Sequence, residues 1–127
     1  MTDQPAAPVG TIVWHDLTVP DAAPVRDFYK EVVGWTATPH DMGEYSDYVV
    51  QAPDSGDTVG GICHARGTNA NVPAQWLMYV TVADVEASAT RCVELGGQIL
   101  DGPRPVGEKP FCVMQDPAGA VLALIEA

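Results

Sequence analysis

The pattern of hydrophobic and polar positions runs through the same cycle twice along the chain. In each half, a run of β-branched and aromatic residues precedes an apolar stripe with helical spacing, and three further strand-like runs follow. The spacing predicts helices over residues 22–33 and 85–95, stopped by Gly34 and by Gly96-Gly97. The apolar positions of the first helix recur at i, i+3, i+4 and i+7, namely Val25, Phe28, Tyr29 and Val32.

The strand-like runs complete this pattern. Strands are expected at residues 11–19, 35–38, 45–52 and 58–64 in the first half, and at 76–82, 98–100, 111–115 and 120–125 in the second. Residues 101–110 are rich in proline and glycine and are predicted as a loop, and residues 1–10 as a flexible tail.

Three landmarks recur at one offset of 63 residues. Val19-Pro20-Asp21 returns as Val82-Ala83-Asp84, and the glycines that end the first helix and the turn after residue 52 return as well, Gly34 as Gly97 and Gly56 as Gly119. The sequence therefore predicts an α+β fold of two tandem βαβββ modules in a single domain over residues 11–127. Module one covers residues 11–65, a linker 66–75, and module two 76–127.

Composition narrows the classes of partner. The 127 residues carry a formal net charge of -11 without a basic stripe, which argues against nucleic acid and would favour a cationic ligand. No apolar run reaches the roughly 20 residues of a membrane span, and no secretory signal is visible, so we expect a cytoplasmic protein without membrane contact. The three cysteines, Cys63, Cys92 and Cys112, are widely spaced and are expected to be reduced core residues.

Several of these motifs together resemble the vicinal oxygen chelate superfamily, which includes glyoxalase I, extradiol dioxygenases and bleomycin-binding proteins. The resemblance rests on the V-x-D turn at Val19, the Phe28-Tyr29 pair and Asp116-Pro117-x-Gly119. A glyoxalase-like or bleomycin-resistance-like subgroup is matched further by Trp14-His15-Asp16-Leu17 and by the Trp-x-x-Tyr-Val run at 76–80. The fold that this resemblance implies is two curled sheets forming a cup-shaped, barrel-like cavity.

Metal enzymes of that superfamily place four ligands in the cup, one from the first and one from the last strand of each module. Carried over by their spacing from the landmarks, these positions hold Trp14, Gly60, Leu77 and Ala123. None of these side chains offers the imidazole, carboxylate or thiolate donors that bind a divalent metal. We therefore expect neither a metal nor another cofactor.

Strand alternation then predicts an apolar, aromatic cup that binds a small organic molecule, planar or cationic and antibiotic-like. Asp16 and Tyr79 occupy equivalent positions in the two modules, and Asp16 is the candidate general base if there is catalysis. The residues predicted to contact the ligand are Trp14, Asp16, Thr18, Gly60, Ile62, His64, Leu77, Tyr79 and Ala123.

Two enzymatic functions remain open at this point. One is a metal-dependent glyoxalase, lyase or dioxygenase with unconventional ligands such as His15 or His64, although alternation places His15 on the face opposite Trp14. The other is a metal-free isomerase that uses Asp16 as its base. A homodimer also remains open, because modules of this superfamily pair within one chain or between two chains.

Overall fold

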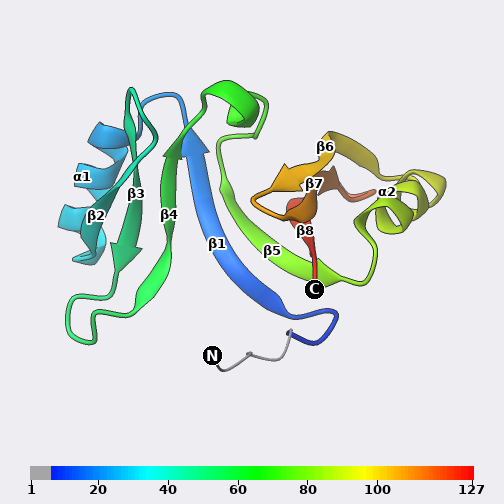
Figure 1. Ribbon diagram of the computed structural model, residues 1–127, viewed down its shortest axis with the longest axis horizontal. Coiled ribbons are helices and arrows are strands. Elements are labelled where there is room, and N and C mark those ends of the chain that lie inside the picture. The colour runs from blue at the N-terminus through cyan, green and yellow to red at the C-terminus, as the bar shows by residue number, and fades with distance from the viewer. Residues whose placement is uncertain (1–6) are drawn as a thin grey trace. The chain divides into compact units, whose positions relative to one another are not determined.

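The computed structural model describes residues 7–127 and divides by contacts into two compact units. The first unit is Trp14–Trp76, and the second unit joins residues 7–13 with Leu77–Ala127. The first half of the chain forms β1 (Ile12–Val19), α1 (Ala22–Val33), β2 (Thr36–Asp41), β3 (Ser46–Gln51), β4 (Thr58–His64) and a 3-10 helix, η1 (Gly67–Asn69). The strand order there is β2-β3-β4-β1, with β1 parallel to β4, as can be followed in Figure 1.

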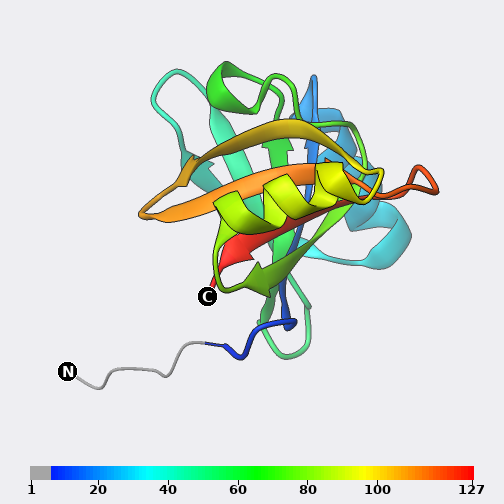
Figure 2. The ribbon, with the colours of Figure 1, turned by 90° about the vertical axis from the view of Figure 1, so that its right-hand side faces the viewer.

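The second half of the chain repeats this plan. Its elements are β5 (Trp76–Val82), α2 (Val85–Glu94), β6 (Gln98–Val106), β7 (Lys109–Gln115) and β8 (Val121–Glu126). The strand order is β5-β8-β7-β6, with β5 parallel to β8, and α2 lies across β7 and β8 in Figure 2. The predicted α+β class and the two βαβββ modules are confirmed.

Both helices begin where the sequence signals predict; α1 also ends there, and α2 ends one residue earlier, at Glu94. The carboxylate of Asp84 accepts a hydrogen bond from the backbone N–H of Ala87 and so caps α2, in the manner usual for an N-cap aspartate. Helix α1 ends at Gly34, whose φ of 86° is the left-handed conformation that favours glycine. The repeated V-x-D and glycine landmarks therefore mark helix boundaries.

Each unit builds its core between its own helix and one face of its sheet. In the first unit Ala22 of α1 packs with Val50 and Ile62, and all three are almost completely buried. In the second unit Val85 and Ala89 of α2 pack with Cys112 and Leu124. We call this side of each sheet the helix face. The opposite side, to which the intervening residues of each strand point, is the far face.

The register of β4 differs from the prediction. Strand β1 pairs Asp16 with Gly61 and Leu17 with Ile62, and the β3–β4 ladder shifts by one residue between Val50 and Gln51. This bulge gives β4 one extra residue, so Gly60 and Ile62 belong to the helix face and not to the far face where they were predicted. Gly61 and Cys63 take the far face instead.

The corresponding strand of the second unit has no such shift. The β7–β8 ladder is regular, and Ala123 pairs with Tyr79 on the far face, which is the face predicted for both residues. The offset between equivalent residues therefore falls from 63 at Asp16 and Tyr79 to 62 at Gly61 and Ala123. The ungapped repeat fails only where the bulge inserts its extra residue.

The predicted loop at residues 101–110 is wrong, because β6 continues to Val106 and turns directly into β7. Strand β6 is the last strand in the order of its sheet, and its register against β7 shifts between Ile99 and Arg104. Prolines are tolerated on an edge strand and at such irregularities, since no neighbour needs the missing N–H on the outer side. A prediction based only on proline and glycine content therefore assigned this segment wrongly to a loop.

The segment before β1 is tied to β5 at several points. The carbonyl oxygen of Pro8 accepts a hydrogen bond from the Thr81 hydroxyl at 2.7 Å, and the N–H of Gly10 donates to the Thr81 carbonyl at 2.8 Å. The remainder of the predicted tail, residues 1–6, lies outside the described residues. Among residues 7–127, no helix is long and apolar enough to cross a membrane.

The two glycines of β4 offer a matched test of the bulge. A Cβ on Gly60 would lie 2.7 Å from the backbone carbonyl oxygen of His15, whereas one on Gly61 would meet nothing closer than 3.5 Å. We expect Gly60→Ala to lower the free energy of unfolding by about 1–3 kcal/mol, as overpacking does. Gly61→Ala should be neutral or slightly stabilising, because alanine loses less backbone entropy on folding. Urea denaturation of both variants checks this, and equal stability would contradict the observed register of β4.

Candidate functional site

The far face of the first unit carries polar groups among apolar ones. Strand β1 contributes Trp14, Asp16 and Thr18 to it, and β4 contributes Gly61 and Cys63. Trp14 and Asp16 are half-buried, and Thr18 is buried. The three predicted β1 residues therefore share one face, and Asp16 lies directly beside Gly61, where no side chain separates it from β4.

Asp47 of β3 joins this group, and the sequence reasoning missed it. Its side chain is only 9% exposed, and its Oδ1 accepts a hydrogen bond of 2.8 Å from the backbone N–H of His64. This carboxylate also interacts with the Cys63 thiol and raises its pKa. Alternation along 46–51 could have put Asp47 on this face, but only a correct β3–β4 register reveals its partners.

The thiol of Cys63 is held in its neutral form. Burial is the main cause, and the negative charges of Asp16 and Asp47 add to it, so the pKa of Cys63 rises to about 12. A nucleophilic cysteine needs a lowered pKa and a positive environment. The far face of the first unit is therefore not arranged for cysteine catalysis.

His64 was predicted as a ligand-contacting residue, and the structure places it at the end of β4 between two carboxylates. Its Nδ1 lies 3.4 Å from Oδ1 of Asp47, and its Nε2 lies 3.8 Å from Oδ1 of Asp21. The ring packs edge-on against Tyr45 at 5.4 Å between centroids, and its side chain is 13% exposed. Most of its surface is thus covered by neighbours in its own unit.

The far face of the second unit carries an aromatic stack under a buried ion pair. Tyr79 and Phe111 stack with centroids 5.5 Å apart, and the Arg104 guanidinium lies 5.0 Å from the Phe111 ring centroid. Arg104 donates hydrogen bonds from Nε and Nη2 to the carboxylate of Asp101, the shortest of them 2.7 Å. The sequence reasoning missed Arg104 and Asp101 because it assigned their segment to a loop.

The remaining predicted contact residues are less accessible. Leu77 and Ala123 have no exposed surface, and Tyr79 is half-buried. With the register corrected, the four metal-ligand positions implied by the resemblance hold Trp14, Gly61, Leu77 and Ala123. None of these side chains is a metal donor. Within residues 7–127, no three His, Cys, Asp or Glu side chains gather in a group that could hold a metal ion.

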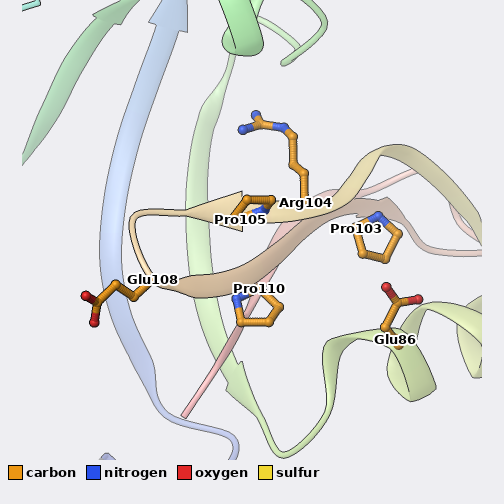
Figure 3. Close-up of a pocket in the computed structure, with 6 residues that line it drawn as sticks. All are labelled: Glu86, Pro103, Arg104, Pro105, Glu108 and Pro110. Atoms are coloured by element: carbon orange, nitrogen blue, oxygen red, sulfur yellow. The ribbon is translucent and has the colours of Figure 1, made fainter.

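Two cavities open on other parts of the molecule. In the second unit a cavity of about 230 Å³ lies between the start of α2 and the β6–β7 hairpin. Figure 3 shows Glu86 and Pro103 facing each other across it, while the Arg104 side chain extends away from Glu86. In the first unit a groove of about 440 Å³ is lined by His15, Trp35, Val59 and Trp76.

Comparison with known families and proteins identifies the type of domain. Residues 12–125 match the family model described as a glyoxalase-like domain. A Mycobacterium tuberculosis protein named "Putative glyoxylase CFP32" is 29% identical over 119 residues, covering 92% of this chain and 44% of that protein. The anthracycline biosynthesis protein DnrV of Streptomyces peucetius is 31% identical over 128 residues, covering 91% and 46%. The chain thus spans about half the length of the curated relatives it matches.

The solved structures that resemble the chain agree with this fold. Methylmalonyl-CoA epimerase from Mycobacterium tuberculosis superposes with a TM-score of 0.54 at 14% sequence identity, covering 97% of this chain and 92% of that one. At this identity the likeness establishes the fold alone.

The raised pKa of Cys63 makes a prediction about thiol reactivity. At pH 8 a thiol with a pKa near 12 is ionised in about one molecule in ten thousand, so Cys63 should react very slowly with an aromatic disulfide reagent. Asp47→Asn removes one of the negative charges that raise this pKa and should speed the reaction, whereas Asp54→Asn in the exposed turn should not. Reaction rates of native protein, with Cys63 followed by peptide mass spectrometry, check this. Fast labelling of the native protein would contradict the burial of this thiol.

The ion pair of the second unit makes a prediction about stability. Arg104 and Asp101 have side chains only 18% and 10% exposed, so Arg104→Met should leave a buried carboxylate without its bidentate partner. We expect it to lower the free energy of unfolding by about 3 kcal/mol, and Asp101→Asn to have a smaller effect. The double variant should lose less free energy of unfolding than the sum of the losses of the two single variants, as measured by urea denaturation. Additive losses would mean that the pair is not coupled.

Proposed function

Because the chain belongs to the glyoxalase-like domain family, within the vicinal oxygen chelate superfamily, we propose that it binds a small organic molecule without a metal ion. The proposed site is the far face of the first unit around Trp14, Asp16 and Thr18. For the second unit, taken by itself, we propose the equivalent residues Leu77, Tyr79 and Ala123 on its own far face as contact residues. Gly60, Ile62 and His64 leave the proposal, because the corrected register gives Gly60 and Ile62 to the helix face and His64 is enclosed by its own neighbours.

One observation carries the proposal more than any other. At the four positions where the superfamily's metal enzymes hold their ligands, this chain has an indole, a hydrogen and two aliphatic side chains, even after the register of β4 is corrected. What surrounds the Trp14 position instead is a carboxylate, Asp16, beside a glycine that leaves space. An aromatic surface next to a carboxylate suits a planar ligand with a positively charged or hydrogen-bonding group.

Two further facts support this ligand class. The net charge of -11 draws cations toward the protein over distances of several ångströms. The names of two Streptomyces relatives, DnrV and DauV, place them in anthracycline biosynthesis, which favours an aromatic natural product over a small aliphatic acid. The role that follows is sequestration or carriage of such a compound, with turnover by Asp16 as the alternative to be tested beside it.

Binding is tested by calorimetry and thermal shift with a panel of aromatic natural products, anthracyclines included, on metal-free protein. Ligand bound only by the folded state must raise the melting temperature. Asp16→Asn should weaken the binding of a cationic ligand by about tenfold, because a partly buried carboxylate interacts strongly with a positively charged partner. Asp54→Asn, an equal change of charge in an exposed turn, should leave affinity unchanged.

Two results would contradict the proposal. One is stoichiometric Zn, Ni, Mn or Fe in the purified protein that is required for binding and is lost in His15→Ala. The other is turnover of a ligand that Asp16→Asn abolishes while binding persists, which would make the protein an isomerase-type enzyme.

A further inference from the structure

The helix face of the first unit holds an aromatic groove that the proposed function does not use. It is lined by Trp35, Trp76, Val59 and His15 and has a volume of about 440 Å³. We propose that this groove is a separate binding site for a planar aromatic cation. His15 follows Trp14 on β1, so strand alternation puts the groove and the proposed far-face site on opposite sides of this strand.

The aromatic wall of the groove is held in place by its own contacts. The indole N–H of Trp76 donates a hydrogen bond of 2.9 Å to the hydroxyl of Tyr29 on α1. Trp35 packs against Trp76 with centroids 5.6 Å apart at 72°, and Tyr29 lies 5.4 Å from Trp76 and 5.7 Å from Trp35. Because the polar atom of Trp76 is satisfied within this cluster, its ring surface that faces the groove is left for apolar contact.

The chain cannot fill this groove with a side chain of its own at Gly60. A Cβ there would lie 3.7 Å from Cζ3 of Trp76 and would first collide with the His15 carbonyl oxygen at 2.7 Å. The bulge that puts Gly60 on the helix face therefore leaves this position beside Trp76 without a side chain. The volume that remains falls in the range of small-molecule sites, roughly 300–1,000 Å³.

The burial of the wall differs from that of the neighbouring core. Val50 and Ile62 are 1% and 0% exposed, whereas Trp35 and Trp76, the largest side chains of the same cluster, are only half-buried. Large aromatic residues supply most of the apolar area of a core when they are fully covered. Two that stay partly open around one concave space have the makeup of a ligand pocket.

Charge decides which planar molecule fits best. The first unit carries nine acidic and three basic side chains, so its field attracts cations, and the groove lining itself contains no Lys or Arg to repel them. Tryptophan faces attract cations further through their quadrupole. An aromatic cation therefore gains from both interactions, whereas an aromatic anion of the same shape gains from neither.

The test uses proflavine, a planar tricyclic cation, with anthraquinone-2-sulfonate as the anionic planar control. Calorimetry on the full chain should give saturable binding of proflavine and at least about tenfold weaker binding of the anion. Val59→Phe, which fills the groove, should weaken the binding of proflavine at that site by about tenfold or more. Val93→Phe, the same change at an exposed position on α2 of the second unit, should leave this binding event intact.

A second measurement keeps the proposal testable if Val59→Phe folds poorly by circular dichroism. The chain has three tryptophans, and two of them line the groove. In a proflavine titration followed by NMR, the indole N–H signals of Trp35 and Trp76 should shift together, and their midpoint should be unchanged by Asp16→Asn.

Three results with proflavine would overturn the inference. They are no saturable binding of proflavine, binding that a folded Val59→Phe leaves unchanged, and binding that is lost in Trp14→Phe or Asp16→Asn. A concentration-dependent dimer that protects Trp35 and Trp76 in place of the probe would also overturn it, because the groove would then be an interface between copies. These outcomes are separate from failure of the proposed function, which is judged by Asp16→Asn with its own ligands.

Discussion

The close approach of Gly60 to the carbonyl oxygen of His15 is the constraint on which the first unit depends. Only glycine fits there, and the bulge around it sets which residues of β4 turn toward α1. Ile62 then completes the core with Ala22 and Val50, while Gly61 and Cys63 turn to the far face beside Asp16. A single extra residue in one strand thus decides both the packing of the core and the composition of the candidate site.

The same bulge explains which features of the fold and of the candidate site could be predicted from the sequence and which could not. Hydrophobic periodicity, capping residues and glycine stops predicted both helices and seven of the eight strands closely, and the resemblance to the vicinal oxygen chelate superfamily is confirmed by the glyoxalase-like domain match. The faces of β1, β5 and β8 followed from alternation alone. The face of β4 did not, because the bulge is marked in the pattern only by a glycine pair, and glycines also occur in regular strands that another backbone approaches closely. Residues that depend on strand pairing, above all Asp47, were out of reach for the same reason.

The second unit shows a different limit. Residues 101–110 contain three prolines and two glycines, and this composition predicted a loop. An edge strand tolerates such residues because one of its sides needs no ladder hydrogen bonds, so β6 forms in spite of them. The error removed Asp101 and Arg104 from the set of candidate residues, although they form the best-connected ion pair of that unit. Functional residues on an edge strand are easily missed by propensity arguments. Such a strand forms ladder hydrogen bonds on one side only, so it tolerates residues that predict a loop.

The two units use one topology for different surfaces. On the far face of the first, two carboxylates surround a thiol whose pKa burial raises to about 12, and an indole lies on the same strand as one of them. On the far face of the second, aromatic rings stack beneath a guanidinium that a carboxylate neutralises. Equivalent positions, Asp16 and Tyr79, have therefore diverged in charge, so the duplication no longer supplies pairs of like ligands. A symmetric metal site needs donors at equivalent positions in both modules. An organic ligand sets no such requirement on equivalent positions, because an aromatic molecule with one polar end is itself unsymmetric.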